Sequence, residues 1–295
     1  MNEEIAKMLT DYRNKTIADT KNRLKEIIQE ISLLALSHTD FFSHAAFYDG
    51  TALRIFYGLD RFSEDMDFSL IQSEPDFNLE DYLSAIEVEL NSYGFEMSAE
   101  YKNKKNPSAV QSAFIKGNTL VQLIRIMEMQ PPISGVPNNE VIKIKIEIDT
   151  NPPKGAGYEQ KFRLQPQPFS IKMYDRPSLF AGKIHALLCR NWKQRIKGRD
   201  FYDYIWYLSE SIPVNLPHLE ARMIQTGHWS DEDSLTLPKV KELLYNRFDK
   251  VNYEQAKEDI IPFISDPDKL AIWSKDFFTA VTHEKLILPV SDSSS

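Results

Sequence analysis

Two aspartates separated by one residue are the first feature of the sequence that could do chemistry. Asp65 and Asp67 flank Met66, and the apolar Phe68 and Leu70 follow them. On a strand, residues at this spacing point to the same face, so the two carboxylates would repel each other unless a cation lies between them. Mg²⁺ prefers such hard oxygen ligands and often binds one or two carboxylates together with substrate phosphates. The pair therefore predicts a Mg²⁺ or Mn²⁺ site, with a turn carrying two solvated acids as the alternative.

A segment that could bind phosphate precedes the aspartate pair. Gly50 and Thr51 stand at the start of a short helix that we predict over residues 51–57. Backbone N–H groups at a helix N-terminus attract anions, so a triphosphate could dock there. Arg54, on the first turn, could pair with a phosphate or with a neighbouring acid. The alternative is an ordinary helix cap in which Asp49, Gly50 or Thr51 serves as the capping residue.

A third carboxylate is predicted on a later strand. Residues 142–150 alternate strictly between apolar and charged side chains, which indicates a strand with one apolar and one charged face. Lys145, Glu147 and Asp149 share the charged face. In phosphoryl transfer, an additional acid beside an aspartate pair helps to bind a second metal or takes the proton from the attacking hydroxyl. We give this role to Asp149 and leave the role of Glu147 open, and a solvated charged face is the alternative for the whole set.

Basic residues gather in one part of an otherwise acidic chain. Lys183 lies within a largely apolar helical segment, where it either keeps its ammonium in water or reaches inward to a phosphate. Residues 190–199 are rich in Arg and Lys, and Tyr202 follows them. Such a segment could contact a triphosphate or an RNA backbone, with aromatic rings stacking on bases. A solvated loop between helices would explain most of these charges equally well.

The bulk properties exclude several classes of protein. The chain has 295 residues, 42% of them hydrophobic, and a formal net charge of −8, which permits two globular domains and argues against a DNA-coating role. Six scattered histidines and the absence of a Gly-x-x-x-x-Gly-Lys-Ser/Thr sequence argue against a zinc site and a P-loop. Cys189 alone cannot form an internal disulfide. Because no apolar run is long enough to span a bilayer and the N-terminus has no signal core, we expect a soluble, cytoplasmic protein that does not enter membranes.

The elements that would position these residues fall into two groups. We predict helices over residues 3–37, 51–57 and 79–93 and strands over 66–70, 95–101, 113–127 and 142–150. Beyond Pro177 the pattern is helical, with segments predicted at 178–190, 198–209, 216–226, 237–249, 253–261 and 273–282. This organisation predicts an α+β domain over 1–175, a helical domain over 176–290 and a disordered tail over 291–295.

Together these motifs resemble the AbiEii/MenT family of nucleotidyltransferase-like toxins. The matching segments occur in the family's order and span roughly residues 45–205: Gly50-Thr-Ala-Leu-Arg54, Arg61-Phe-Ser-Glu-Asp-Met-Asp-Phe68, Lys145-Ile-Glu-Ile-Asp149, Lys183-Ile-His-Ala-Leu-Leu188 and Lys197-Gly-Arg-Asp-Phe-Tyr-Asp203. The resemblance implies a polymerase-β-like nucleotidyltransferase domain, with a mixed sheet and flanking helices, followed by a C-terminal α-helical domain.

The resemblance also implies roles for individual residues. Gly50 and Thr51 would cradle phosphate, Asp65 and Asp67 would hold the metal, and Asp149 would be the third acid. In the helical domain, Lys183 would bind phosphate and Asp200 would complete the site. The activity implied is transfer of a nucleoside monophosphate from an NTP to a tRNA 3′ end. The biological setting implied is a cytoplasmic toxin of a toxin–antitoxin or phage-defence system, with a DNA-binding antitoxin as partner.

One position departs from the family pattern. Asp49 stands where the family usually has Gly, and its carboxylate would repel a triphosphate unless it turns away or joins the metal ligands. Two alternatives therefore stay open beside transfer to tRNA. The same acids would serve a nucleotidyltransferase that modifies a protein or a small molecule such as an antibiotic. Asp49 itself favours a partner protein that binds nucleotide without turning it over.

Overall fold

The computed structural model describes residues 3–9, 16–103, 108–191 and 196–289. Contacts within the chain divide it into two compact units, which we name the sheet unit and the helical unit. The sheet unit comprises Met1–Tyr57, Ser63–Pro152 and Glu159–Met173, and the helical unit comprises Gly58–Phe62, Pro153–Tyr158 and Tyr174–Ser295. The division into domains at 1–175 and 176–290 stays a prediction, and the tail predicted at 291–295 lies outside the described residues.

A mixed seven-stranded sheet forms the sheet unit, as the resemblance implied. Its strand order is β3-β4-β5-β2-β1-β7-β6. The bounds are β1 Ala45–Tyr48, β2 Met66–Leu70, β3 Ser98–Tyr101, β4 Val110–Asn118, β5 Val141–Asp149, β6 Tyr158–Arg163 and β7 Phe169–Tyr174. Strand β2 pairs antiparallel with β1 and parallel with β5. The strand predicted at 142–150 is confirmed, because the isoleucines of β5 are buried and alternate with more exposed charged residues.

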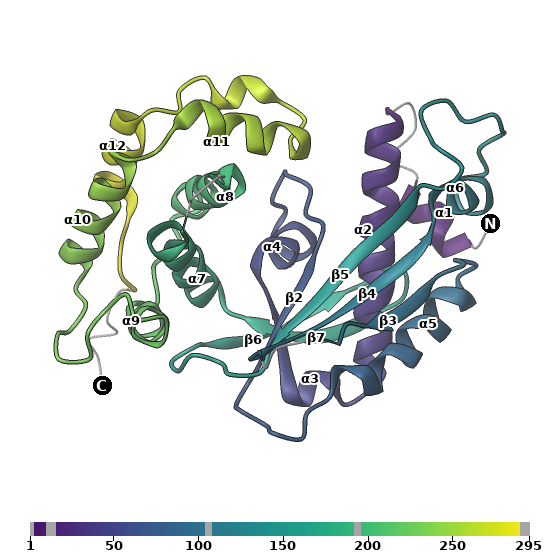
Figure 1. Ribbon diagram of the computed structural model, residues 1–295, viewed down its shortest axis with the longest axis horizontal. Coiled ribbons are helices and arrows are strands. Elements are labelled where there is room, and N and C mark those ends of the chain that lie inside the picture. Colours follow the sequence, from purple (N-terminus) through teal and green to yellow (C-terminus); the bar gives the residue numbers. More distant parts are fainter. Residues whose placement is uncertain (1–2, 10–15, 104–107, 192–195, 290–295) are drawn as a thin grey trace. The chain divides into compact units, whose positions relative to one another are not determined.

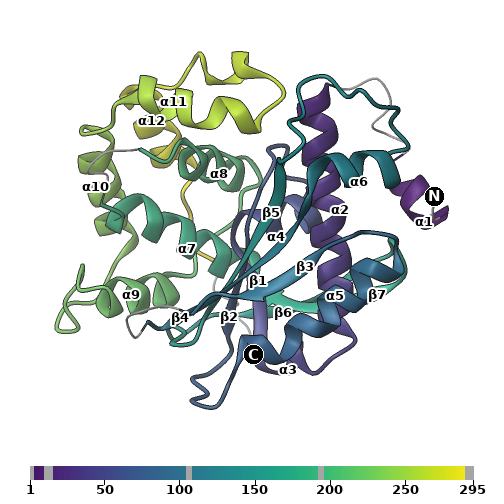
Figure 2. The ribbon, with the colours of Figure 1, turned by 45° about the vertical axis from the view of Figure 1, so that its right-hand side comes forward.

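Helices flank this sheet. Their bounds are α1 Glu3–Leu9, α2 Ile17–Ser37, α3 Phe41–His44, α4 Asp49–Tyr57, η2 Leu79–Tyr82, α5 Leu83–Ser92 and α6 Thr119–Arg125. Helix α2 packs against α5 and β5, and Figures 1 and 2 show it running along the sheet. Its central residues, including Ile27, Ile28, Ile31 and Leu34, are fully buried and form much of the core.

Two sequence predictions for this unit were wrong in detail because side chains cap helices. The single helix predicted over 3–37 is interrupted, and α2 begins afresh where Thr16 and Asp19 form a capping box. The long strand predicted over 113–127 ends at Asn118, whose side chain accepts the backbone N–H of Val121 and starts α6. In both cases polar side chains set the helix start, and the sequence pattern alone did not show this.

The helical unit contains the helices that the sequence predicted beyond Pro177. Their bounds are α7 Arg176–Cys189, α8 Gly198–Ser209, α9 Leu216–Gln225, α10 Leu237–Phe248, α11 Tyr253–Ile260, η3 Ile261–Phe263, η4 Pro267–Leu270 and α12 Lys275–Lys285. Helices α7, α9 and α10 begin with a side-chain cap followed by proline in the first turn. Aromatic residues of α7, α8, α10 and α12 fill the core. None of the helices in the described parts of the chain has the length and apolar character needed to cross a bilayer.

Candidate active site

The aspartate pair lies at the start of a central strand of the sheet. Asp67 is the second residue of β2, and Asp65 directly precedes that strand. Because β2 lies between β1 and β5, Asp67 has a neighbour on each side: Tyr48 at the end of β1 and Glu147 on β5. Asp49 follows Tyr48 at the first position of α4. Strand pairing thus brings carboxylates from three separate segments of the chain to one place.

Burial and charge repulsion both disfavour the ionised form of Asp67 in this cluster. Burial is the largest cause that raises the pKa of Asp67 well above its usual value, and the negative charges of Asp49, Asp65 and Glu147 raise it further. Only the ammonium of Lys145 acts in the opposite direction among the causes of this shift. A divalent cation bound here would relieve the repulsion and keep Asp67 ionised.

Strand register distinguishes the two acids that the sequence placed on one face of β5. Glu147 lies directly opposite Asp67, whereas Asp149 lies opposite Ser69, two pairs further along. The role of Asp149 as third acid stays a prediction, and its side chain accepts the backbone N–H of Asn151 at 2.9 Å. The geometry brings Glu147, which the sequence left open, next to the aspartate pair.

Two neighbours orient the Glu147 carboxylate. Ser112 on β4 donates its hydroxyl to Oε1 at 3.0 Å, and the ammonium of Lys145 lies 2.5 Å from Oε2. Each oxygen of Glu147 therefore has a partner within the sheet. A side chain held in this way is placed in advance for a ligand that binds beside Asp67.

Asp49 adopts a backbone conformation that favours glycine. Its φ is +66°, in the left-handed region that residues with a Cβ adopt at a cost. Glycine reaches this region without strain, which gives a physical reason for the glycine that the resemblance led us to expect. Its negative charge is among the causes that raise the pKa of Asp67, so Asp49 acts electrostatically on the acid cluster.

Helix α4 is tied to the strand that carries the aspartates. Thr51 is only 1% exposed, and its hydroxyl donates to the backbone carbonyl of Asp65. Gly50 is also buried at the start of this helix. Since the Thr51 hydroxyl is engaged in this way, the predicted phosphate contacts of Gly50 and Thr51 would come from their backbone N–H groups. Those contacts stay predictions.

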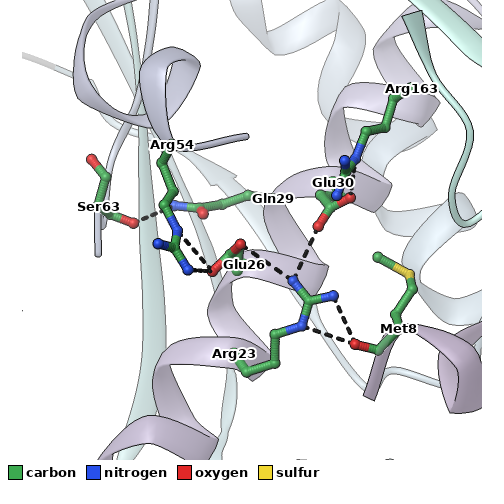
Figure 3. Close-up of polar contacts among 8 residues, drawn as sticks. All are labelled: Met8, Arg23, Glu26, Gln29, Glu30, Arg54, Ser63 and Arg163. Carbon is green, nitrogen blue, oxygen red and sulfur yellow. Dashed lines mark hydrogen bonds and ion pairs between the residues drawn. The ribbon is translucent and has the colours of Figure 1, made fainter. Parts of the chain in front are cut away.

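Arg54 has a partner that the sequence did not indicate. Its guanidinium donates to the Glu26 carboxylate on α2, from Nε at 3.4 Å and from Nη2 at 3.3 Å. Figure 3 shows this pair beside Arg23, whose Nη1 lies 3.3 Å from Glu26 Oε1. Arg54 thus joins α4 to α2, and its predicted contact with phosphate stays a prediction.

Lys183 and Asp200 come together in the helical unit. The Lys183 ammonium lies 3.0 Å from Asp200 and 2.9 Å from Asp203, and Arg190 contacts Asp200 at 2.7 Å. Arg61 donates two hydrogen bonds to the Asp203 carboxylate, from Nε at 2.6 Å and from Nη2 at 2.7 Å. Lys183 is buried, so it does not extend its ammonium into solvent. Arg61 and Asp203 belong to the family-like segments 61–68 and 197–203, but the sequence did not predict a role for either residue. Only the fold shows that they pair with each other.

The acids of the sheet unit have the chemistry of a magnesium site that a substrate would complete. Within the described ranges, no group of three or more His, Cys, Asp or Glu residues is arranged so that it could hold a metal ion by itself. Mg²⁺ commonly needs only one or two carboxylates from the protein, because water and substrate phosphates supply the remaining ligands. Asp65 and Asp67, with Glu147 beside them, fit that requirement. The basic residues expected at 192–195 lie outside the described residues.

Comparison with known protein families gives a match over most of the chain. Residues 31–282 match the model of the nucleotidyl transferase AbiEii toxin family, type IV toxin–antitoxin system. The curated proteins yield no match. Among solved structures, JHP933 from Helicobacter pylori is 16% identical with a TM-score of 0.47, covering 89% of this chain and 91% of that one. A second H. pylori structure, described as a candidate nucleotidyltransferase, is 16% identical with a TM-score of 0.46, covering 88% and 93%.

The family match extends over most of the chain, including the aspartate pair, Glu147 and the ion pairs of Lys183. The chain belongs to the AbiEii family of nucleotidyltransferase toxins from type IV toxin–antitoxin systems.

Proposed function

We propose that this protein transfers a nucleoside monophosphate from an NTP to an acceptor hydroxyl, with Mg²⁺ bound by Asp65 and Asp67. The observation that carries the proposal is the placement of Asp67, which is surrounded by the charges of Asp49, Asp65 and Glu147 at the start of a central strand. A cluster of like charges is costly for a folded protein unless it serves a ligand of opposite charge. Membership of a nucleotidyltransferase family supports the same reaction.

The reaction divides into roles that these residues can perform. Asp65 and Asp67 would hold the Mg²⁺, which would supply positive charge to offset that of the triphosphate. The acceptor oxygen attacks the α-phosphorus, the bond to the β-phosphate oxygen breaks, and pyrophosphate leaves. A carboxylate accepts the proton of the acceptor hydroxyl. Glu147 is better placed for this step than Asp149 because it pairs directly with Asp67, and backbone N–H groups of Gly50 and Thr51 would hold the phosphates.

For the acceptor we propose the 3′ end of tRNA, and the support comes from the basic segment that follows α7. Residues 190–199 are rich in Arg and Lys in an otherwise acidic chain, and Tyr202 follows them. Arginine and aromatic groups of this kind suit a single-stranded RNA end. A cognate antitoxin that binds DNA and a cytoplasmic setting complete the proposal.

A second function has one observation in its favour. Asp49 adds a carboxylate at a strained position next to the proposed triphosphate site. Its repulsion would slow catalysis more than it would weaken binding if the metal is displaced from the reactive position. The protein would then bind nucleotide without turnover. Transfer to a protein or small molecule is the remaining alternative, because the acids alone do not specify the acceptor.

A transfer assay tests these proposals together. The protein is incubated with Mg²⁺, total tRNA and each labelled NTP in turn, beside an Asp67→Ala variant and a reaction without Mg²⁺. We expect label on tRNA that requires both Mg²⁺ and Asp67. NTP binding without label on tRNA would contradict transfer to tRNA, and release of pyrophosphate in the same reaction would then separate another acceptor from binding without turnover.

A further inference from the structure

Gln29 is a polar residue in the buried part of α2. It is 0% exposed, and its neighbours along the helix, Ile27, Ile28 and Ile31, are also fully buried. Burying an amide costs free energy unless its hydrogen bonds are replaced. The use of Gln at this position therefore needs a reason other than core packing.

The amide nitrogen of Gln29 holds the segment that leads to the aspartate pair. Nε2 donates to the carbonyl of Ser63 at 3.1 Å and to the carbonyl of Glu64 at 2.9 Å, and Figure 3 shows the bond to Ser63. The next carbonyl, that of Asp65, accepts the hydroxyl of Thr51. Side chains from α2 and α4 thus capture three successive carbonyls immediately before β2. Together they fix the direction in which the chain enters that strand.

Among the described residues, the amide oxygen of Gln29 makes no comparable contact, so the contribution of this side chain lies in the two bonds of Nε2. Its Oε1 is buried and has no hydrogen-bond partner within the described part of the chain. A residue of similar volume without polar atoms would avoid that cost. Ser32, one turn further along α2, provides a contrast. It is also buried, but its hydroxyl returns to the carbonyl of Ile28 in the same helix, at 2.7 Å.

Charged contacts around Gln29 hold α2 itself in place. Arg23 donates to the carbonyl of Met8 through Nε at 3.0 Å and Nη2 at 2.7 Å. Glu30 Oε2 accepts a hydrogen bond from Nε of Arg163 on β6 at 2.7 Å, and Glu26 forms an ion pair with Arg54 on α4. Figure 3 shows that these contacts lie on both sides of Gln29 along the helix. Gln29 therefore projects from a helix that is tied to α1, α4 and β6.

We infer that Gln29 is a positioning residue for the metal-binding aspartates, because its amide fixes the Ser63 and Glu64 carbonyls and so directs Asp65 and Asp67 toward one cation. The part of this inference that concerns the cation rests on the proposed function. The part that concerns the loop rests on the hydrogen bonds alone.

The test replaces Gln29 with Met, which has a similar volume but no donor. Ser32→Ala is the matched control, because it removes a buried polar group from the same helix without touching the loop. Gln29→Asn keeps the amide but shortens the side chain by one methylene, so the amide nitrogen no longer reaches the two carbonyls. This variant replaces Gln29→Met if the Met variant does not fold. Two quantities are measured on the full chain: hydrogen exchange of amides 63–67 without metal, and the Kd for Mn²⁺ by electron paramagnetic resonance.

We expect faster exchange of amides 63–67 in both Gln29 variants and no change in Ser32→Ala. Mn²⁺ affinity should fall about tenfold in the Gln29 variants, as is typical of residues that orient a metal ligand. Wild-type exchange in Gln29→Met would overturn the inference, and so would faster exchange with unchanged Mn²⁺ affinity. Absence of Mn²⁺ binding in the wild type would contradict the proposed function, and the exchange result would then decide separately whether Gln29 holds the loop.

Discussion

The two units bury charge in opposite ways. In the sheet unit, Asp67 is surrounded by other carboxylates, and Lys145 is the only counter-charge among the causes of its raised pKa. In the helical unit, the buried Asp203 is contacted by the cations of Arg61 and Lys183. The first cluster consists mainly of like charges, whereas in the second each carboxylate has cationic partners.

This difference is the one expected between a site that binds a cation, as we propose for the sheet unit, and a set of charges that neutralise one another within the protein. Paired buried charges are neutralised by each other, and removing one leaves its partner buried and uncompensated. A cluster of like charges, by contrast, destabilises the fold, so the folded protein becomes more stable when one charge is removed or when a cation binds. The roles predicted for Lys183 and Asp200 therefore compete with a simpler one, in which their ion pairs join α7 to α8.

Asp203→Asn should produce the largest effect of the changes that probe this comparison. The substitution breaks the charged contacts of a carboxylate that is 0% exposed and contacts two buried cations. We expect a loss of about 3–5 kcal/mol in the free energy of unfolding, the usual cost of breaking a buried ion pair. Urea unfolding followed by circular dichroism measures it.

Asp60→Asn is the control in the same unit. Asp60 pairs with Lys269, but both side chains are about half exposed. Exposed pairs contribute at most about 1 kcal/mol. If the two variants lost similar free energies, the Asp203 cluster would not act as a buried ion pair, and the contrast between the units would fail.

Asp67→Asn should change stability in the opposite direction. Because the pKa of Asp67 is raised in the folded protein, folding favours its protonated form. The stability from this group is fully present below its unfolded pKa and is lost as pH rises through the folded pKa. At neutral pH without divalent cations we expect the variant to be more stable than the wild type, by on the order of 1–3 kcal/mol for a buried like-charge contact.

Thermal unfolding at several pH values tests this prediction. The gain in Asp67→Asn should be small in acid and should grow as pH rises. Adding Mg²⁺ should stabilise the wild type and reduce the difference between the two proteins. A variant that is less stable than the wild type at every pH would show that Asp67 makes favourable contacts that outweigh the repulsion.

The sequence predicted the local parts of the site well and its long-range parts poorly. The alternation of residues 142–150 placed Glu147 and Asp149 on one face of a strand, as the structure confirms. Period-two alternation cannot distinguish them, however, because only the register between β2 and β5 puts Glu147 opposite Asp67. The Arg54–Glu26 pair was not predicted for a similar reason. Its two residues lie on different helices, and no local sequence pattern shows how those helices pack.

Comparing Glu147→Gln with Asp149→Asn sharpens the assignment of the third acid. Both variants remove one carboxylate from the same face of β5, but only Glu147 pairs with Asp67. We expect Glu147→Gln to weaken Mn²⁺ binding about tenfold, or about 1.4 kcal/mol, and Asp149→Asn to have little effect. Isothermal titration of each variant measures the affinity. The reverse order of effects would restore the role that the sequence gave to Asp149.

Asp49→Gly should give the smallest change, and it acts on both backbone strain and charge. Glycine adopts the φ of +66° without the cost of roughly 1–2 kcal/mol that a side chain incurs there, although its greater freedom in the unfolded chain offsets part of the gain. It also removes one charge that raises the pKa of Asp67. We therefore expect a net stabilisation of about 1 kcal/mol in thermal unfolding.

Asp49→Asn separates the two contributions, because asparagine removes the charge and keeps the side chain. If repulsion by Asp49 limits the proposed transferase, both variants should bind a Mg²⁺–NTP complex more tightly than the wild type. If Asp49 is instead a metal ligand, both should bind Mn²⁺ more weakly, although glycine still stabilises the fold. The sign of the change in metal affinity thus decides whether this carboxylate opposes the ligand or belongs to its site.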